Sequence, residues 1–66
     1  MHICLNGQDR DVAPDATVLS LLAGLSIPLQ AAVVELNGVV LDRARFEELV
    51  LAEEDRLELI RFVGGG

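Results

Sequence analysis

Two Asn-Gly pairs constrain the fold of this 66-residue chain more than any other feature. Asn6-Gly7 separates the segments HICL and QDRDV, and Asn37-Gly38 separates AVVEL and VVL. Both residue types tolerate a positive φ, so an Asn-Gly pair favours the two-residue type I′ turn that joins antiparallel strands. The sequence therefore predicts two β-hairpins. Their strands are residues 2–5, 8–12, 32–36 and 39–41. The charged second strand is expected at a sheet edge.

The segment between the hairpins, residues 14–25, predicts the main helix. Thr17 is expected to be its N-cap, with Asp15 as the competing cap. Gly24 and Pro28 are expected to end it. A helix this short needs a sheet to pack against. The apolar stripe of this helix, which would face the sheet, consists of Val18, Leu21, Leu22 and Leu25.

The last apolar segment, RLELIRFV at residues 56–63, alternates as a strand does. One face carries Leu57, Leu59 and Arg61, and the other carries Glu58, Ile60 and Phe62. A strand that is apolar on both faces belongs in the middle of a sheet, with the helix on one side. Before it, Asp42 is expected to cap a helical turn through Arg43–Phe46, and Leu49–Leu51 is predicted as one more short strand.

The order strand, strand, helix, strand, strand, strand predicts an α+β domain. In it, a mixed sheet of four to five strands packs on one main helix. We expect residues 1–63 to form this domain and residues 64–66 to be a flexible glycine tail. A chain of this length buries only about 60% of the surface that it exposes when unfolded. A deep catalytic cleft is therefore not expected, and neither is an enzyme.

The net charge indicates which kinds of partner the chain can bind, and the cysteine count bears on its cellular compartment. The chain has a net charge of −6, with eleven acidic residues, five arginines and no lysine. Nucleic acid and anionic membranes repel such a surface, whereas a basic protein surface attracts it. The start of the sequence shows no secretory signal, and a single cysteine cannot form an internal disulfide. The cytoplasm is therefore the expected compartment. One histidine and one cysteine give no metal-ligand spacing.

Several segments together resemble the ThiS family, the sulfur carriers of bacterial thiamin thiazole synthesis. These segments are the Asn6-Gly7 hairpin, TVLSLL at the helix start, VVELNGVVL in the middle, and EEDRLELIRFVGGG at the end. The resemblance implies a ubiquitin-like β-grasp fold. The small subunit of molybdopterin synthase shares this fold and a Gly-Gly end but is usually longer. This chain departs from the family at EEDR, where an Asp-Gly-Asp turn is common.

The resemblance also implies a function for the glycine end. The carboxylate of Gly66 would be adenylated with ATP by an E1-like adenylyltransferase (ThiF-like) and converted to a thiocarboxylate by a sulfur-relay enzyme. It would then donate its sulfur to thiazole synthase (ThiG-like). Gly64 and Gly65 would thread the partner's active site, because residues without side chains fit a narrow channel. The chain itself is expected to bind no cofactor or metal and to have no catalytic residue.

Other residues leave alternatives open. Ile60 and Phe62 are expected either to be covered by neighbouring loops or to form an exposed patch that docks partner enzymes. Cys4 is expected to be a small buried or half-buried strand residue, and His2 is expected to be exposed. The acidic residues are either a solvated face or a surface that steers association with a basic partner. They are Glu47, Glu48, Glu53, Glu54, Asp55 and Glu58.

Three other functions remain open at this point. The chain could be a sulfur carrier for molybdopterin or cysteine synthesis, or a ubiquitin-like modifier joined to target lysines. It could also be an interaction module with an inert tail, because glycine-rich ends are often simply frayed.

Overall fold

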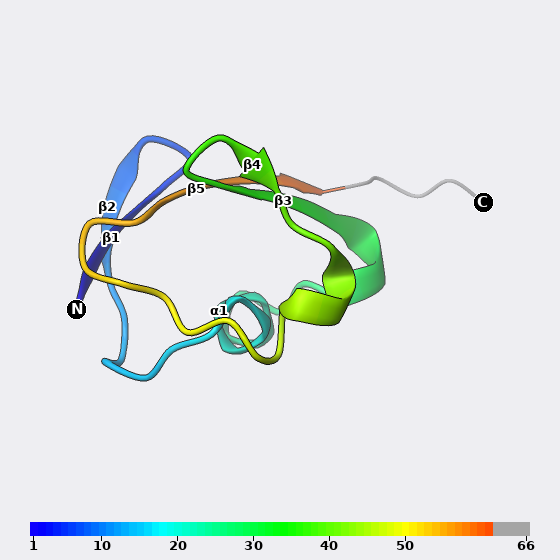
Figure 1. Cartoon of the computed structure of the whole chain (residues 1–66), viewed down its shortest axis with the longest axis horizontal. Helices are drawn as coiled ribbons and strands as arrows, with labels where there is room; N and C mark the ends of the chain where they lie inside the picture. Colours follow the sequence, from blue (N-terminus) through cyan, green and yellow to red (C-terminus); the bar gives the residue numbers. More distant parts are fainter. Residues whose placement is uncertain (62–66) are drawn as a thin grey trace.

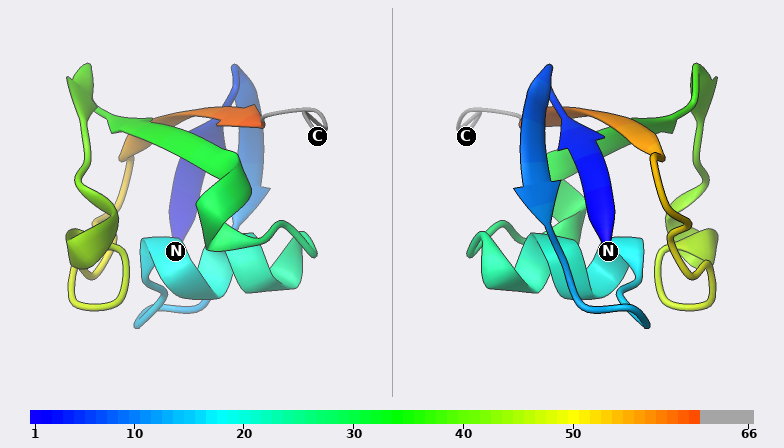
Figure 2. Two further views of the ribbon diagram at one scale, coloured as in Figure 1. Left: turned by 90° about the vertical axis from the view of Figure 1, so that its right-hand side faces the viewer. Right: turned by 90° about the vertical axis from the view of Figure 1, so that its left-hand side faces the viewer.

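The computed structural model describes residues 1–61, which form a five-stranded mixed sheet over a single α-helix (Figures 1 and 2). The sheet order is β2-β1-β5-β3-β4, with β5 parallel to β1 and antiparallel to β3. The predicted mixed sheet on one helix, with the last strand in the middle, is confirmed. The strands are β1 (His2–Leu5), β2 (Gln8–Asp11), β3 (Ala32–Leu36), β4 (Val39–Val40) and β5 (Arg56–Arg61). The helix is α1 (Val18–Gly24), and the short 3₁₀ turns are Leu29–Ala31 and Arg43–Arg45.

Both Asn-Gly pairs adopt the left-handed backbone that a type I′ turn requires. The φ angles are 50° and 80° at Asn6 and Gly7, and 50° and 88° at Asn37 and Gly38. The two predicted hairpins are therefore confirmed, and β2 lies at a sheet edge as expected. An L-residue in this region costs roughly 1–2 kcal/mol unless, like asparagine, it can form local hydrogen bonds.

The two asparagine side chains also bind the central strand. The Leu59 N–H donates to Asn6 Oδ1 at 2.7 Å, and the Arg56 N–H donates to Asn37 Oδ1 at 2.9 Å. Asn37 Nδ2 in turn donates to the Asp55 carboxylate at 3.0 Å. Each hairpin turn therefore fixes the position of β5 as well as joining its own two strands.

Helix α1 begins directly after Thr17, which is the N-cap rather than Asp15. The Ser20 N–H donates to Thr17 Oγ1 at 3.1 Å, and the Thr17 N–H donates to Ser20 Oγ at 2.9 Å. This reciprocal pair is a capping box in which serine replaces the usual glutamate. The first residues of the predicted segment, including Pro14, lie before the helix. Within residues 1–61, no helix is long and apolar enough to cross a membrane.

The core lies between the sheet and α1. From the helix, Val18 and Leu22 are fully buried, whereas Leu21 and Leu25 are half-buried at its border. Phe46 is also buried in the core, and its carbonyl accepts a 2.9 Å hydrogen bond from the Leu19 N–H. The remaining buried side chains are Ile3, Leu5, Ala16, Ala32, Val34, Leu51 and Leu57.

The prediction of a sheet strand at Leu49–Leu51 is wrong. Val50 forms an isolated antiparallel bridge with Thr17, and the Leu51 N–H donates to the Ala16 carbonyl at 2.8 Å. This segment therefore pairs with the chain just before α1, below the sheet (Figure 1). The physical reason is that Leu51 is buried in the same core cluster as Ala16 and Val18, so the segment stays beside the start of α1.

Asn37 adopts a positive φ and also forms hydrogen bonds with residues 55 and 56. A variant that loses both properties should therefore be less stable than one that loses only the hydrogen bonds. Asn37→Gly keeps the positive φ but loses the hydrogen bonds to residues 55 and 56, which should cost about 1–2 kcal/mol of unfolding free energy. Asn37→Ala adds backbone strain and should cost about 2–3 kcal/mol. Urea denaturation of the two variants beside the wild-type chain measures both costs. Equal, near-zero losses would contradict the role of Asn37 in fixing β5.

Candidate functional site

Strand β5 leads directly into the segment expected to carry the chemistry. It ends at Arg61, which lies opposite Ala32 of β3. Phe62 and the three glycines Gly64, Gly65 and Gly66 lie outside the described residues, so their predicted roles stay predictions, as does the division of the chain at residue 63. The structure therefore describes β5, the strand that directly precedes these residues in the sequence.

One face of the sheet is left uncovered by α1, and we call it the open face. Its alternating residues near the end of β5 are Glu58 and Ile60, which lie opposite Glu35 and Val33 of β3. Ile60 is 53% exposed. On the next strand, Val40 lies opposite Glu35 and is 62% exposed. Among residues 1–61, neighbouring loops therefore do not cover Ile60, and the open face carries exposed apolar side chains close to where β5 ends.

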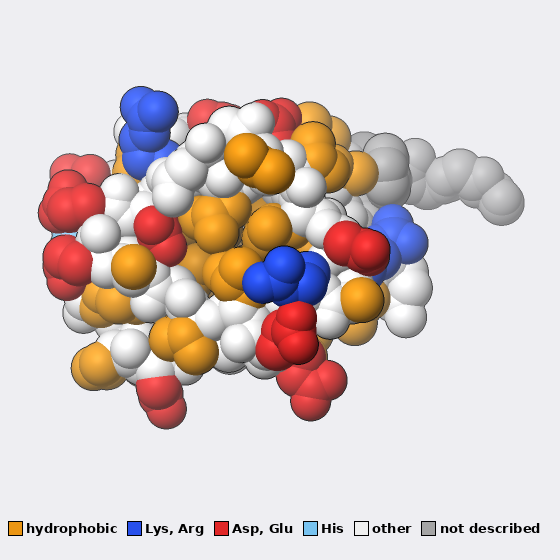
Figure 3. All heavy atoms as spheres, viewed as in Figure 1, with side chains coloured by type: hydrophobic (Ala, Val, Ile, Leu, Met, Phe, Trp, Pro, Cys, Tyr) orange, Lys and Arg blue, Asp and Glu red, His pale blue; other side chains and the backbone are white. Residues whose placement is uncertain are grey.

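Two carboxylates lie side by side on this open face. Glu35 and Glu58 occupy directly opposed positions on β3 and β5, an arrangement in which like charges repel. Arginine or lysine groups of a second protein would relieve that repulsion on binding. The open face thus combines apolar side chains with negative charge. On the side of the molecule shown in Figure 3, carboxylates also outnumber the basic side chains.

Cys4 is half-buried on β1, as predicted. It lies opposite Arg56 in the parallel register between β1 and β5. Both residues line a shallow cavity of about 280 Å³ on the open face, together with Glu35 and Glu58. The sequence did not indicate a basic residue opposite this cysteine, because the two positions are 52 residues apart.

A cluster of His2, Asp9, Glu53 and Glu54 forms at the end of the sheet where the chain begins. The ring Nδ1 of His2 lies 2.9 Å from Glu54 Oε1, and Nε2 lies 3.2 Å from Asp9 Oδ1. The His2 backbone N–H donates to Glu53 Oε1 at 2.8 Å. His2 is therefore engaged on several sides rather than simply exposed.

This cluster raises the pKa of His2 above its ordinary value of 6.5. The largest cause is the hydrogen bond with Glu54, followed by a smaller opposing effect of desolvation and then by the negative charges of Glu54 and Asp9. His2, Glu53 and Glu54 bring three possible metal-ligand atoms within 4.8 Å of one another, which the sequence spacing did not indicate. Because both ring nitrogens already face carboxylates, the geometry suits an imidazolium ion that links β1, β2 and the turn before β5.

The raised pKa of His2 predicts a pH-dependent contribution to stability. The contribution should be fully present below about pH 6.5 and lost as pH rises through the higher folded-state pKa. The wild-type chain should therefore be more stable relative to a His2→Gln variant at about pH 5.5 than at about pH 8.5. Urea denaturation at the two pH values gives this difference. A wild-type advantage that is equal at both values, or larger at the alkaline one, would contradict the ion pairing.

Comparison with known proteins shows similarity to the ThiS family and to proteins of thiamin biosynthesis. The sequence model of the ThiS family matches residues 3–66. The sulfur carrier protein ThiS of Bacillus subtilis is 35% identical over 63 residues, which cover 94% of this chain and 96% of that protein. A thiazole synthase of Magnetococcus marinus is 36% identical over 66 residues. That match covers the whole of this chain but 20% of the synthase, so the chain spans one fifth of that relative's length.

A solved structure supports the same comparison. The crystal structure of the thiamine biosynthesis protein ThiS of Geobacter metallireducens superimposes with a TM-score of 0.83 at 35% sequence identity. The match covers the full length of both chains. The predicted β-grasp, ubiquitin-like fold is thereby confirmed.

Proposed function

The chain belongs to the ThiS family of sulfur carriers in thiamin biosynthesis, and from that membership we propose that Gly66 carries sulfur as a C-terminal thiocarboxylate. The single observation that carries this proposal is the extent of the family match, which runs over residues 3–66 and so includes the glycine end. On this proposal the chain is a protein cosubstrate and not an enzyme. Its partners supply the catalytic groups.

The chemistry explains why the glycine end needs activation. A carboxylate is a poor electrophile, because its charge repels nucleophiles and its oxygen is a poor leaving group. An E1-like adenylyltransferase (ThiF-like) would use ATP to form an acyl adenylate at Gly66 and release pyrophosphate. A persulfide sulfur of the relay enzyme could then displace AMP and form an acyl disulfide. A thiol reductant would cleave the S–S bond and release the thiocarboxylate. The carrier itself would bind no cofactor, since ATP is bound by the activating partner.

The fold supports this use of the C-terminal segment. Strand β5 pairs with β1 on one side and β3 on the other, so the sequence that ends on the three glycines follows a strand that is held on both sides. Three glycines can span about 10 Å when extended, at roughly 3.3–3.6 Å each. They have no side chains, so a narrow channel in a partner can admit them.

A thiazole synthase (ThiG-like) is the proposed acceptor of the sulfur. Thiazole synthases of Magnetococcus marinus and Paramagnetospirillum magneticum each contain a segment similar to the whole of this chain. Joining two interacting units in one protein raises their effective concentration, so this arrangement supports a partnership between carrier and synthase. A reducing compartment that supplies ATP, the cytoplasm, suits both the activation step and the single cysteine, Cys4.

Intact-mass analysis tests the proposed function. The purified chain is incubated with the adenylyltransferase, the relay enzyme, a sulfur donor, a thiol reductant and ATP. The expected product is a chain in which one oxygen at the terminus is replaced by sulfur. Gly65→Val should keep the fold but fail to be adenylated, because a β-branched side chain blocks the channel and restricts the backbone. Normal ATP–pyrophosphate exchange with this variant would contradict the channel argument.

The same measurement on protein taken from native cells separates the other functions. A ladder of conjugates would identify a protein modifier, and an unmodified mass would identify an interaction module. A thiazole requirement after gene deletion would exclude carriers for molybdopterin or cysteine synthesis. The similarity to Bacillus subtilis ThiS over 96% of its length favours the thiamin carrier among these.

The open face predicts where the activating partner docks. Ile60→Ala and Phe62→Ala should each weaken binding to the adenylyltransferase by about tenfold, or ~1.4 kcal/mol, because central apolar contacts dominate interface energies. Stability should change by less than about 0.5 kcal/mol for Ile60→Ala, whose side chain is largely exposed. Calorimetric titration and urea denaturation measure the two effects.

Val50→Ala is the matched control, because Val50 is 56% exposed but lies on the segment that pairs with Thr17, away from the open face. It should bind normally. A large loss of stability in Phe62→Ala without a binding defect would instead place Phe62 in the core. If the acidic residues steer the encounter with the partner, high salt should lower the association rate constant. An unchanged rate constant would show that these residues do not steer association.

A further inference from the structure

Within the described part of the chain, the outer edge of strand β2 carries no paired strand. Among residues 1–61, β2 pairs with β1 alone. The Val12 N–H donates to the Met1 carbonyl at 2.8 Å, and the Met1 nitrogen donates to the Val12 carbonyl at 2.9 Å. Because hydrogen-bonded and non-hydrogen-bonded pairs alternate along antiparallel strands, the Met1–Val12 pair fixes the roles of the other residues. Arg10 directs its backbone N–H and C=O toward β1, whereas Asp9 and Asp11 direct theirs outward. Four backbone hydrogen-bonding groups are thus presented at the edge.

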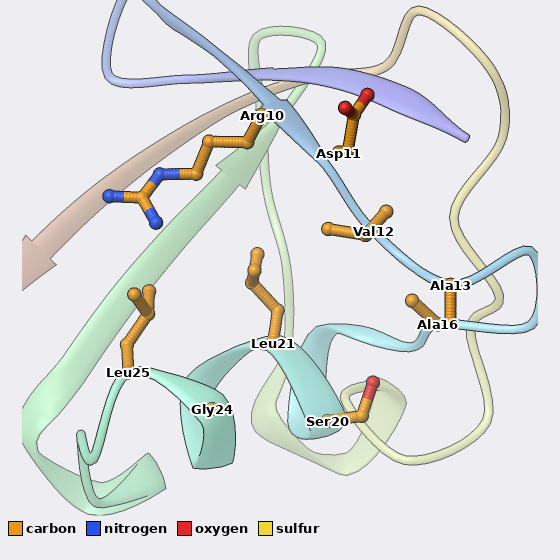
Figure 4. A pocket seen from close by; sticks show the side chains of 9 residues that line it. All are labelled: Arg10, Asp11, Val12, Ala13, Ala16, Ser20, Leu21, Gly24 and Leu25. Atoms are coloured by element: carbon orange, nitrogen blue, oxygen red, sulfur yellow. The ribbon is translucent and has the colours of Figure 1, made fainter.

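A groove lies directly beside this edge, between β2 and α1. It has a volume of about 370 Å³. Figure 4 shows Leu21 and Leu25 pointing from the helix toward the strand, with the Arg10 side chain extending above Leu25. The Asp11 carboxylate points away from the groove (Figure 4). Much of the remaining lining is small or apolar, namely Val12, Ala13, Ala16 and Gly24.

We propose that the β2 edge and this groove bind an extended segment of a partner protein that carries a basic–apolar–basic sequence. In an added strand, residues opposite Asp9 and Asp11 would lie on the open-face side, where these carboxylates attract lysine or arginine. The residue between them would lie on the groove side, opposite Arg10. There the groove favours an apolar side chain, and the guanidinium disfavours a basic one.

A second copy of this chain is a poor occupant of the same edge. Two β2 strands paired antiparallel would bring Asp9 and Asp11 of one copy beside those of the other. Like charges directly opposite each other are destabilising, and charged edge strands prevent such association in many proteins. The charge pattern thus selects a basic segment and disfavours self-pairing. This proposal does not involve the glycine end, so it can fail while the proposed sulfur chemistry stands.

Two capped peptides of identical composition test the proposal on the full chain. The first is Ser-Arg-Val-Arg-Ser, and the second is Ser-Arg-Arg-Val-Ser, which cannot place its valine between two arginines. In NMR titrations of ¹⁵N-labelled protein, the first peptide should shift the amide signals of residues 9–12 and 21–25. It should bind about three- to tenfold more tightly than the second, as expected for two favourable cross-strand charge pairs.

A groove-filling variant with a matched control completes the test. Among residues 1–61, a Cβ on Gly24 would lie within 4 Å of no atom except those of its chain neighbours and of the helix backbone, so the position has room for the start of a side chain. Gly24→Leu should weaken binding of the first peptide about threefold or more, whereas Gly24→Ala should bind like the wild-type chain. Equal affinity for the two peptides, shifts elsewhere on the domain, normal binding by Gly24→Leu, or a dimer through β2 would each overturn the proposal.

Discussion

Strand β5 is held by hydrogen-bonded neighbours on both sides and by asparagine side chains from both hairpin turns, and the rest of the domain depends on that arrangement. The Asn6 side chain binds Leu59, and the Asn37 side chain binds Arg56. Two turns that are distant in sequence therefore fix one strand between them. A 66-residue chain buries little surface, so its hydrophobic core alone stabilises it only weakly. Because the side chains of both hairpin turns bind the central strand, each turn also contributes to tertiary stability.

The central position of β5 also determines how the two faces of the sheet differ. On the helix side, Leu57 is buried against the core formed with α1. On the open face, Glu58 and Ile60 remain exposed because no second helix among residues 1–61 covers them. One strand thus contributes to stability on one face and offers a surface for recognition on the other. The proposed reacting end continues from the same strand, so docking on the open face would also position that end.

Local chemistry made much of this fold predictable from the sequence. The hairpins follow from the φ preferences of Asn-Gly, the helix start from the Thr17 hydroxyl, and the central strand from its two apolar faces. Features that depend on distant residues were not predictable. Leu49–Leu51 pairs with the segment before α1 instead of with a strand, and His2 meets Glu54 across 52 positions. Nor did the sequence indicate the groove between β2 and α1. The predicted function of the glycine end came from the family resemblance, because three glycines alone do not distinguish a carrier from a frayed terminus.

The proposed function requires that several enzymes recognise the chain without a change in its own structure. The proposed chemistry takes place at Gly66, five residues beyond the end of β5 at Arg61. On that proposal, replacing one oxygen by sulfur at Gly66 alters no residue of β5 or of the strands that pair with it. The proposed partners would then distinguish the loaded from the unloaded chain by the terminal group itself. The domain would then need only to offer a constant surface, and the two surfaces proposed above, the charged edge at β2 and the open face around Ile60, lie at different places on the molecule.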